Sequence, residues 1–332
     1  MNLIKPKKLF FFIFIFFINY LLITAFVFSF SYISLINGKT YDLFWIKSIQ
    51  NKIYFRGYRN IWQFQKECVN FDKYLLYKPK AGVCSFSNPE FRTILTFDEL
   101  TRSHNVENKN FNPENDFLVL GDSIAMGWGV NDNETFSYNL EKILKKNFYN
   151  LAVSSYGTIR SIKRMKSSKY YQNSKNILIQ YHSNDIYENK QLNFNKIYST
   201  KDFDNIFNYK IQTTNKIRLI LRNYKSSLRL FFSDIVDILF KEKNLETIDF
   251  KEHQKFLEKI LNENINFNEK RVIVIFPKMP WQKVINFPIS NKKIEYLLID
   301  LDKSNFFTID DHPNKIGHYE IAKIVSSYLS NN

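Results

Sequence analysis

The sequence has little of what builds a metal site or a nucleic-acid interface. Only two cysteines, Cys68 and Cys84, occur in 332 residues, and neither has the spacing of a zinc ligand. The formal net charge is +15, but the lysines are spread over the whole chain, without a dense basic run or an RNA-binding aromatic signature. We therefore expect no nucleic-acid partner and no metal or organic cofactor.

The composition also argues against disorder. Hydrophobic residues make up 45% of the chain and aromatic residues 17%, which supplies enough apolar material for an ordered core. The length suits one substantial domain with an anchor and a smaller extension.

Charged residues are absent from residues 9–36. About 20 apolar residues cross the hydrocarbon layer of a membrane, whereas a secretory signal has about 7–15 followed by a small-residue cleavage site, which is not evident here. This run therefore favours a single transmembrane anchor over a cleaved signal. Lys5, Lys7 and Lys8 precede it, so residues 1–8 are expected to be a cytoplasmic tail and the rest of the chain to be periplasmic or exterior.

Residues 37–112 mix aromatic residues with turn formers, and we interpret them as a membrane-proximal extension. Cys68 and Cys84 lie in this segment, where an oxidising compartment would permit a disulfide. Closing so short a loop would be worth about 3 kcal/mol in the chain-entropy model. The sequence leaves open whether the two thiols are linked.

Short apolar runs mark the main domain, which we place at residues 113–332. They lie at residues 117–120, 176–181 and 271–276, and they have the character of strands buried in a parallel sheet. Helical patterns alternate with them, so we expect an α/β domain. The stretch from about 190 to 268, which is charged and amphipathic across roughly 203–264, is expected to be a helical insertion that either covers the site or lies at the surface.

Polar residues follow two of these runs directly. Ser123 ends the motif Gly121-Asp122-Ser123 after the first run, and Asn184 comes shortly after the second. Active sites of such sheets form beyond the carboxyl ends of the strands. A serine at the start of a helix also lies among unpaired N–H groups that stabilise an oxyanion. The motif is not a G-x-S-x-G elbow, and a plain helix N-cap is the alternative role for Ser123.

A histidine near the end of the chain supplies a general base. His312 lies directly before Pro313 and a predicted helix over about 319–329. Asp310 and Asp311 precede it, and a nearby aspartate fixes the tautomer of a catalytic histidine and stabilises its imidazolium form. The order serine, aspartate, histidine is then complete.

These motifs, taken together, resemble those of the SGNH hydrolase superfamily, the GDSL-like lipases and esterases. Four blocks match in order across most of residues 115–330, at Gly121-Asp122-Ser123, residues 150–157, Asn184-Asp185 and residues 310–318. The resemblance implies a flavodoxin-like three-layer α/β/α domain with a central parallel sheet.

The resemblance also implies a catalytic triad. Ser123 would be the nucleophile, His312 the general base and Asp310 the carboxylate that orients it. The family's Asp-x-x-His spacing would place Ile309 at the acid, so the acid is Asp310 or Asp311. We favour Asp310, because adjacent residues rarely aim their side chains at each other.

The same resemblance implies an oxyanion hole. Its donors would be the backbone N–H of Ser123, the side-chain amide of Asn184 and a backbone N–H at Ser155 or Gly157. Ser155 stands where the family has a glycine, and so does His182, to which we assign no catalytic role.

The function implied is hydrolysis of acyl or acetyl esters through a Ser-His-Asp triad. Transfer of the acyl group to a sugar hydroxyl instead of water would make the chain an O-acyltransferase, and a catalytically inactive binding domain is the other alternative. The anchor and its orientation suggest an envelope polysaccharide, peptidoglycan or lipid as the ester-bearing substrate.

Overall fold

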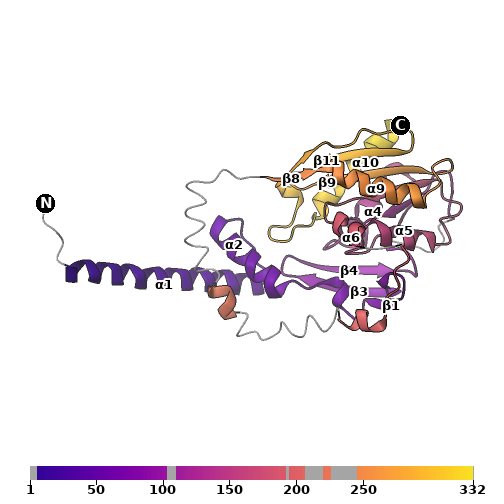
Figure 1. The fold of residues 1–332 in the computed structure, drawn as a ribbon. Coiled ribbons are helices and arrows are strands. Elements are labelled where there is room, and N and C mark those ends of the chain that lie inside the picture. Colours follow the sequence, from indigo (N-terminus) through magenta and orange to yellow (C-terminus); the bar gives the residue numbers. More distant parts are fainter. Residues whose placement is uncertain (1–5, 103–109, 192–193, 206–219, 226–244, 332) are drawn as a thin grey trace.

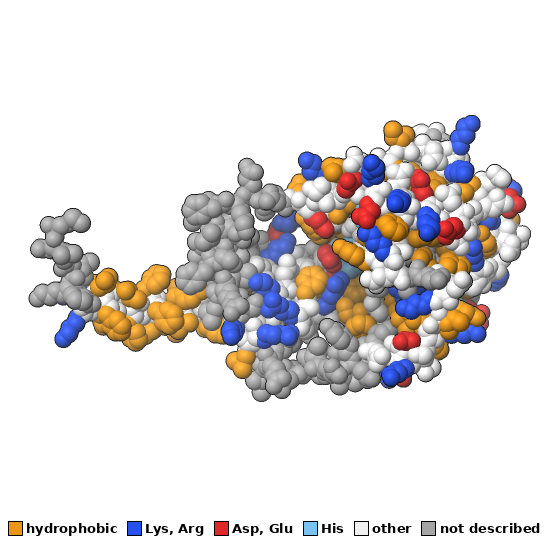
Figure 2. All heavy atoms as spheres, viewed as in Figure 1, with side chains coloured by type: hydrophobic (Ala, Val, Ile, Leu, Met, Phe, Trp, Pro, Cys, Tyr) orange, Lys and Arg blue, Asp and Glu red, His pale blue; other side chains and the backbone are white. Residues whose placement is uncertain are grey.

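The computed structural model describes residues 6–102, 110–191, 194–205, 220–225 and 245–331. Figure 1 shows a long N-terminal helix, α1 (Pro6–Ile36), that projects from the remainder of the chain. Its span Lys7–Ile36 is long and apolar enough to cross a membrane, as the sequence predicts, and Figure 2 shows hydrophobic side chains along the projecting helix. An N-terminal helix of this kind serves either as a signal anchor or as a signal sequence.

The central sheet has five parallel strands in the order β11-β9-β7-β5-β6. Their bounds are β5 (Phe117–Leu120), β6 (Phe148–Asn150), β7 (Asn176–Gln180), β9 (Arg271–Lys278) and β11 (Ile294–Asp300). Numbered along the chain, this is the 2-1-3-4-5 order of flavodoxin-like sheets. The predicted fold class is therefore confirmed.

Helices cover both faces of this sheet, which gives the three layers. One face packs against α5 (Thr158–Lys166) and α9 (Phe250–Asn264), and the other against α4 (Phe136–Leu144) and α10 (Lys315–Asn331). Successive strand residues point to opposite faces, so Leu118 joins one apolar cluster and Val119 the other. The remaining short helices are α3 (Ser123–Met126), η3 (Asp132–Glu134), α6 (Asp185–Gln191) and η4 (Lys303–Asn305).

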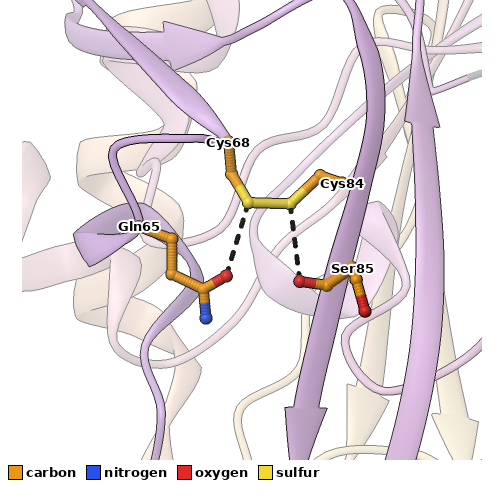
Figure 3. Close-up of a disulfide and its surroundings, with 4 residues drawn as sticks. All are labelled: Gln65, Cys68, Cys84 and Ser85. Atoms are coloured by element: carbon orange, nitrogen blue, oxygen red, sulfur yellow. Dashed lines mark hydrogen bonds between the residues drawn. A yellow bond between two sulfur atoms is a disulfide. The ribbon is translucent and has the colours of Figure 1, made fainter.

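The extension is packed onto the domain. It contains α2 (Phe44–Ile53), η1 (Tyr54–Tyr58), η2 (Trp62–Phe64) and two antiparallel hairpins, β1 (Val69–Asp72) with β2 (Leu76–Pro79) and β3 (Gly82–Asn88) with β4 (Phe91–Phe97). Trp62 and Phe86 are fully buried in the same cluster as Phe136 of α4. A disulfide joins Cys68 to Cys84 on β3, with a Cα–Cα distance of 5.4 Å (Figure 3). The extension therefore shares the core of the domain.

The end of the stretch expected to be a helical insertion, about 190–268, belongs to the layers of the domain. β8 (Glu246–Asp249) pairs in parallel with β10 (Gln282–Ile285), and α9 is one of the helices that cover the sheet. A helix that covers a sheet is amphipathic by necessity, so its charged outer face gives it the pattern of an insertion. Residues 206–219 and 226–244 lie outside the described residues.

The C-terminal half of α1 is packed against the domain. Thr24, Phe28, Ser31 and Leu35 are buried, and their spacing of four, three and four residues puts them on one face of the helix. Phe28 and Leu35 belong to an apolar cluster with residues of α2, η1 and the loop after β11, namely Ile49, Ile53, Tyr54 and Ile309. Ser34 is buried as well, and the other residues in this half of α1 are exposed or half-buried.

Candidate active site

Three loops at the carboxyl end of the sheet bring the predicted site residues together. Ser123 begins α3 directly after β5, Asn184 follows β7, and His312 lies between β11 and α10. β5 and β7 are neighbours, but the next strands of this sheet along the chain, β6 after β5 and β9 after β7, lie on opposite sides of the pair. Ligands bind at such switch points in open α/β sheets.

A hydrogen-bonded chain joins Ser123, His312 and Asp310. The Nε2 atom of His312 lies 2.7 Å from Oγ of Ser123, and its Nδ1 atom lies 2.5 Å from Oδ1 of Asp310. Asp311 is farther away, with 3.4 Å between its Oδ1 and the same Nδ1. Its side chain is 49% exposed, whereas that of Asp310 is fully buried. Of the two aspartates, Asp310 has the geometry of the orienting acid.

The carboxylate of Asp310 is held by residues that the sequence did not predict. Tyr54 donates its hydroxyl and Trp128 its indole N–H, at 3.1 Å, to Oδ2. The Trp128 ring also stacks on the His312 imidazole, with 4.9 Å between centroids. Tyr54 lies 256 residues before Asp310, so no local pattern in the sequence signals this contact.

Arg59, a cationic residue of the extension, lies beside the Asp310 carboxylate. The Arg59 guanidinium is 3.5 Å from Asp310, 3.3 Å from Asp311 and 3.2 Å from Nδ1 of His312. Asp310, Asp311 and His312 are also the one group in the described residues whose atoms lie close enough to ligate a metal ion. Because Arg59 already supplies a positive charge there, and hydrogen bonds occupy both oxygens of Asp310, the group is not suited to a metal.

The charges set the basicity of the histidine. Burial lowers the pKa of His312, but the carboxylates of Asp310 and Asp311 outweigh burial and raise that pKa to about 9. Burial would raise the pKa of Asp310, but His312 and Arg59 hold it below its usual value. Near neutral pH the imidazole is therefore mostly protonated, and its neutral form becomes populated as the pH rises.

Two residues that line the pocket, Ser123 and Ser155, have backbone N–H groups without an acceptor among the described residues. Ser155 has a φ of 62°, in the left-handed region that favours glycine. This conformation explains why the matched family position is a glycine. Ser155 Oγ accepts a hydrogen bond of 2.8 Å from Gln63 of the extension, and Asn184 presents an exposed side chain nearby.

Gly157 and His182 also stand out in the sequence here, but the structure places neither of them as an oxyanion donor. Gly157 is the residue before α5 and lines an adjoining hollow, not the pocket at His312. Ser155 lines both and is therefore the better placed donor. His182 does line the pocket, and its Nδ1 accepts the backbone N–H of Asn184 at 3.4 Å.

The pocket around Ser123 has a volume of about 160 Å³. It is lined by Ser123, His312, Asn184, Ser155, Trp128, Met279 and three extension residues, Arg59, Ile61 and Gln63, among others. Pockets for drug-sized ligands have about 300–1,000 Å³, so this one suits a small group. A second hollow of about 390 Å³ opens beside it and shares Asp122, Ser155 and Asn184 with it.

Comparison with protein families and curated proteins adds little. No protein-family model matches the chain. Reticulocyte-binding protein homolog 1 of Plasmodium falciparum (isolate 3D7) is 28% identical over 153 residues. The match covers 44% of this chain but only 5% of that protein, so no activity is carried over from it.

Solved structures similar to this chain include GDSL-family lipases and carbohydrate esterases. An acetyl xylan esterase from the rumen bacterium Butyrivibrio proteoclasticus is 13% identical, with a TM-score of 0.33 and coverage of 68% of this chain and 66% of that one. A family two carbohydrate esterase from Cellvibrio japonicus is 14% identical, with a TM-score of 0.30 and coverage of 67% of this chain and 62% of that one. The psychrotrophic esterase EstA from Pseudoalteromonas sp. is 12% identical, with a TM-score of 0.31 and coverage of 66% of this chain and 100% of that one. At such values we argue function from the geometry of the site alone.

Proposed function

We propose that the chain is a membrane-anchored serine esterase that removes a short acyl group, such as acetyl, from a glycan or lipid of the cell envelope. The observation that supports this is the hydrogen-bonded chain from Ser123 through His312 to Asp310, at a pocket with available N–H groups. Nucleophile, base, orienting acid and oxyanion donors are the parts that acyl transfer requires, and they are recognised by geometry rather than by chain order.

In the proposed reaction, Nε2 of His312 accepts the proton of Ser123 Oγ as this oxygen attacks the ester carbonyl. The backbone N–H groups of Ser123 and Ser155 and the amide of Asn184 stabilise the negative charge on the tetrahedral intermediate. His312 then gives its proton to the leaving alcohol, and an acyl-serine remains. Water, activated by His312, releases the acid and restores Ser123.

The size of the pocket supports a short acyl group. About 160 Å³ beside Ser123 has room for a small substituent, and the adjoining hollow of about 390 Å³ has room for the rest of the substrate. If a sugar hydroxyl takes the place of the deacylating water, the same residues make an O-acyltransferase. Measuring the product with water alone and with added sugar distinguishes the two.

We also propose that α1 is a retained anchor and that the domain lies outside the cytoplasm. A helix of 31 residues is about 46 Å long at 1.5 Å per residue, whereas the hydrocarbon core is about 30 Å thick. The packed stretch from Phe28 to Leu35, about 12 Å long at 1.5 Å per residue, accounts for most of the length beyond the hydrocarbon core. The Cys68–Cys84 disulfide suits an oxidising compartment. Protease added to spheroplasts, whose outer layers have been removed, should then digest the domain. Activity of a reporter that works only in the cytoplasm, fused after Asn332, would contradict this topology.

The test of the activity uses the full chain in detergent micelles. Wild type should hydrolyse p-nitrophenyl acetate and be labelled by a serine-reactive fluorophosphonate. Ser123→Ala should lose both, by about 10⁶-fold in kcat, and His312→Ala should lose most of the hydrolysis. A folded wild type that neither hydrolyses esters nor takes up the label would rule out the esterase.

A further inference from the structure

The turn between β3 and β4 reaches the loop that carries the proposed catalytic acid. Glu90 in this turn accepts three consecutive backbone N–H groups, those of Thr308, Ile309 and Asp310, at 2.7, 2.9 and 2.7 Å. The hydroxyl of Thr40, four residues beyond α1, donates to the same carboxylate at 3.1 Å. The Glu90 side chain thus holds the backbone of residues 308–310 in the loop between β11 and α10, which we call the acid loop.

This contact decides the conformation of the loop. Residues 307–310 of the loop have no helical or strand structure, so their N–H groups need an acceptor from elsewhere. Ile309 and Asp310 are buried, whereas Glu90 itself is half-buried. A backbone N–H left unpaired at either buried residue would cost free energy, so the Glu90 carboxylate stabilises this conformation. Hydrogen bonds to a carboxylate are also roughly twice as strong as those between neutral groups.

The end of β3, just before this turn, holds the segment that carries Arg59. Asn88, two residues before Glu90, accepts the backbone N–H of Asn60 at 2.6 Å and donates to the Asn60 carbonyl at 3.2 Å. Asn60 directly follows Arg59, the cation beside Asp310. The turn therefore holds both the backbone of the acid and the group that balances its charge.

We propose that Glu90 is a positioning residue for the catalytic acid, and this rests on the proposed esterase function. By holding the backbone at residues 308–310, Glu90 sets where the Asp310 carboxylate meets the His312 imidazole. It does not line the pocket at Ser123, and the oxyanion donors come from other loops. Its loss should therefore slow the chemical step and leave substrate binding nearly unchanged.

Glu90→Gln is the sharpest variant. Glutamine keeps the shape, but its NH₂ group cannot accept an N–H bond, so at least one of the loop contacts is lost. A misplacement of about 1 Å in a catalytic group costs up to about 100-fold, and we expect kcat to fall about 10-fold to 100-fold with KM within about 2-fold. Glu263→Gln on the exposed face of α9 is the matched control and should behave as wild type.

The pH profile separates positioning from mere stability. If Asp310 is displaced, it supports the protonated imidazole of His312 less well, so the acidic limb of kcat/KM should move to lower pH. A variant that only loses stability would show fewer sites titrated by fluorophosphonate, with an unchanged profile per labelled site. That result, or wild-type kcat in a folded Glu90→Gln, overturns the inference.

Thr40→Val provides a second, milder variant if Glu90→Gln does not fold. It removes one hydrogen bond to the Glu90 carboxylate and should lower kcat about 2-fold to 10-fold in the same direction. A folded Thr40→Val with the wild-type rate and pH profile overturns the inference in that case. An inactive and unlabelled wild type is a different outcome, because it removes the proposed function and this inference together.

Discussion

Replacing Leu35 by alanine tests whether the end of α1 supports the active site. Leu35 is fully buried and packs in one cluster with Tyr54, whose hydroxyl donates to Asp310, and with Ile309, the residue before Asp310. Truncating a buried leucine to alanine costs about 2–5 kcal/mol, because apolar contacts are lost and a cavity remains. For a domain of 150–250 residues, 1 kcal/mol shifts Tm by about 2–4 °C. We therefore expect Tm to fall by about 4–20 °C and hydrolysis to weaken as Tyr54 moves.

The matched control lies on the same helix. Leu22 is 63% exposed, so Leu22→Ala removes the same atoms from a position without such packing. Both variants are prepared as full chains in the same detergent, and Tm and p-nitrophenyl acetate hydrolysis are measured for each. If the two variants unfold at the same temperature and retain the same activity, the end of α1 is not part of the catalytic domain and the reasoning fails.

Two further predictions concern the acid and the base. Asp310→Asn should lower kcat by about 10⁴-fold while Asp311→Asn costs far less, as measured by ester hydrolysis; equal losses would contradict the assignment of Asp310. For His312, kcat/KM should rise from pH 7, reach half of its maximum near pH 9 and level off above that pH, as the imidazole loses its proton. Its pKa is raised above the unfolded value of about 6.5, so its stabilising contribution is complete below pH 6.5 and is lost as the pH rises through 9. Activity and thermal stability should thus change in opposite directions over this range, and a flat pH–rate profile would contradict the raised pKa.

Much of the sheet could be predicted because its inner strands are continuous apolar runs. β5, β7 and β9 are buried on both faces and have no polar alternation to obscure them. β6 is only three residues long, and β11 lies at the edge with several half-exposed residues, so neither gives a clear pattern.

The site divides in a similar way. Ser123 and His312 follow from their places beside a strand and a helix, and Asp310 follows from its nearness to His312 in the chain. Arg59 and Glu90 could not be predicted, because they meet the acid loop across 251 and 220 residues of sequence. Such contacts depend on how the extension packs, and a single sequence carries no local sign of it.

The packed face of α1 has a consequence for where the proposed esterase can work. A flexible linker lets a tethered domain move out by roughly 5–6 Å times the square root of its length in residues, but here the helix runs directly into the apolar cluster behind Asp310. With α1 in the membrane, the pocket therefore stands at one fixed height above the lipid surface, without slack. Esters far out in an envelope layer would be beyond its reach, and a membrane-attached substrate would have to present its acyl group at that height.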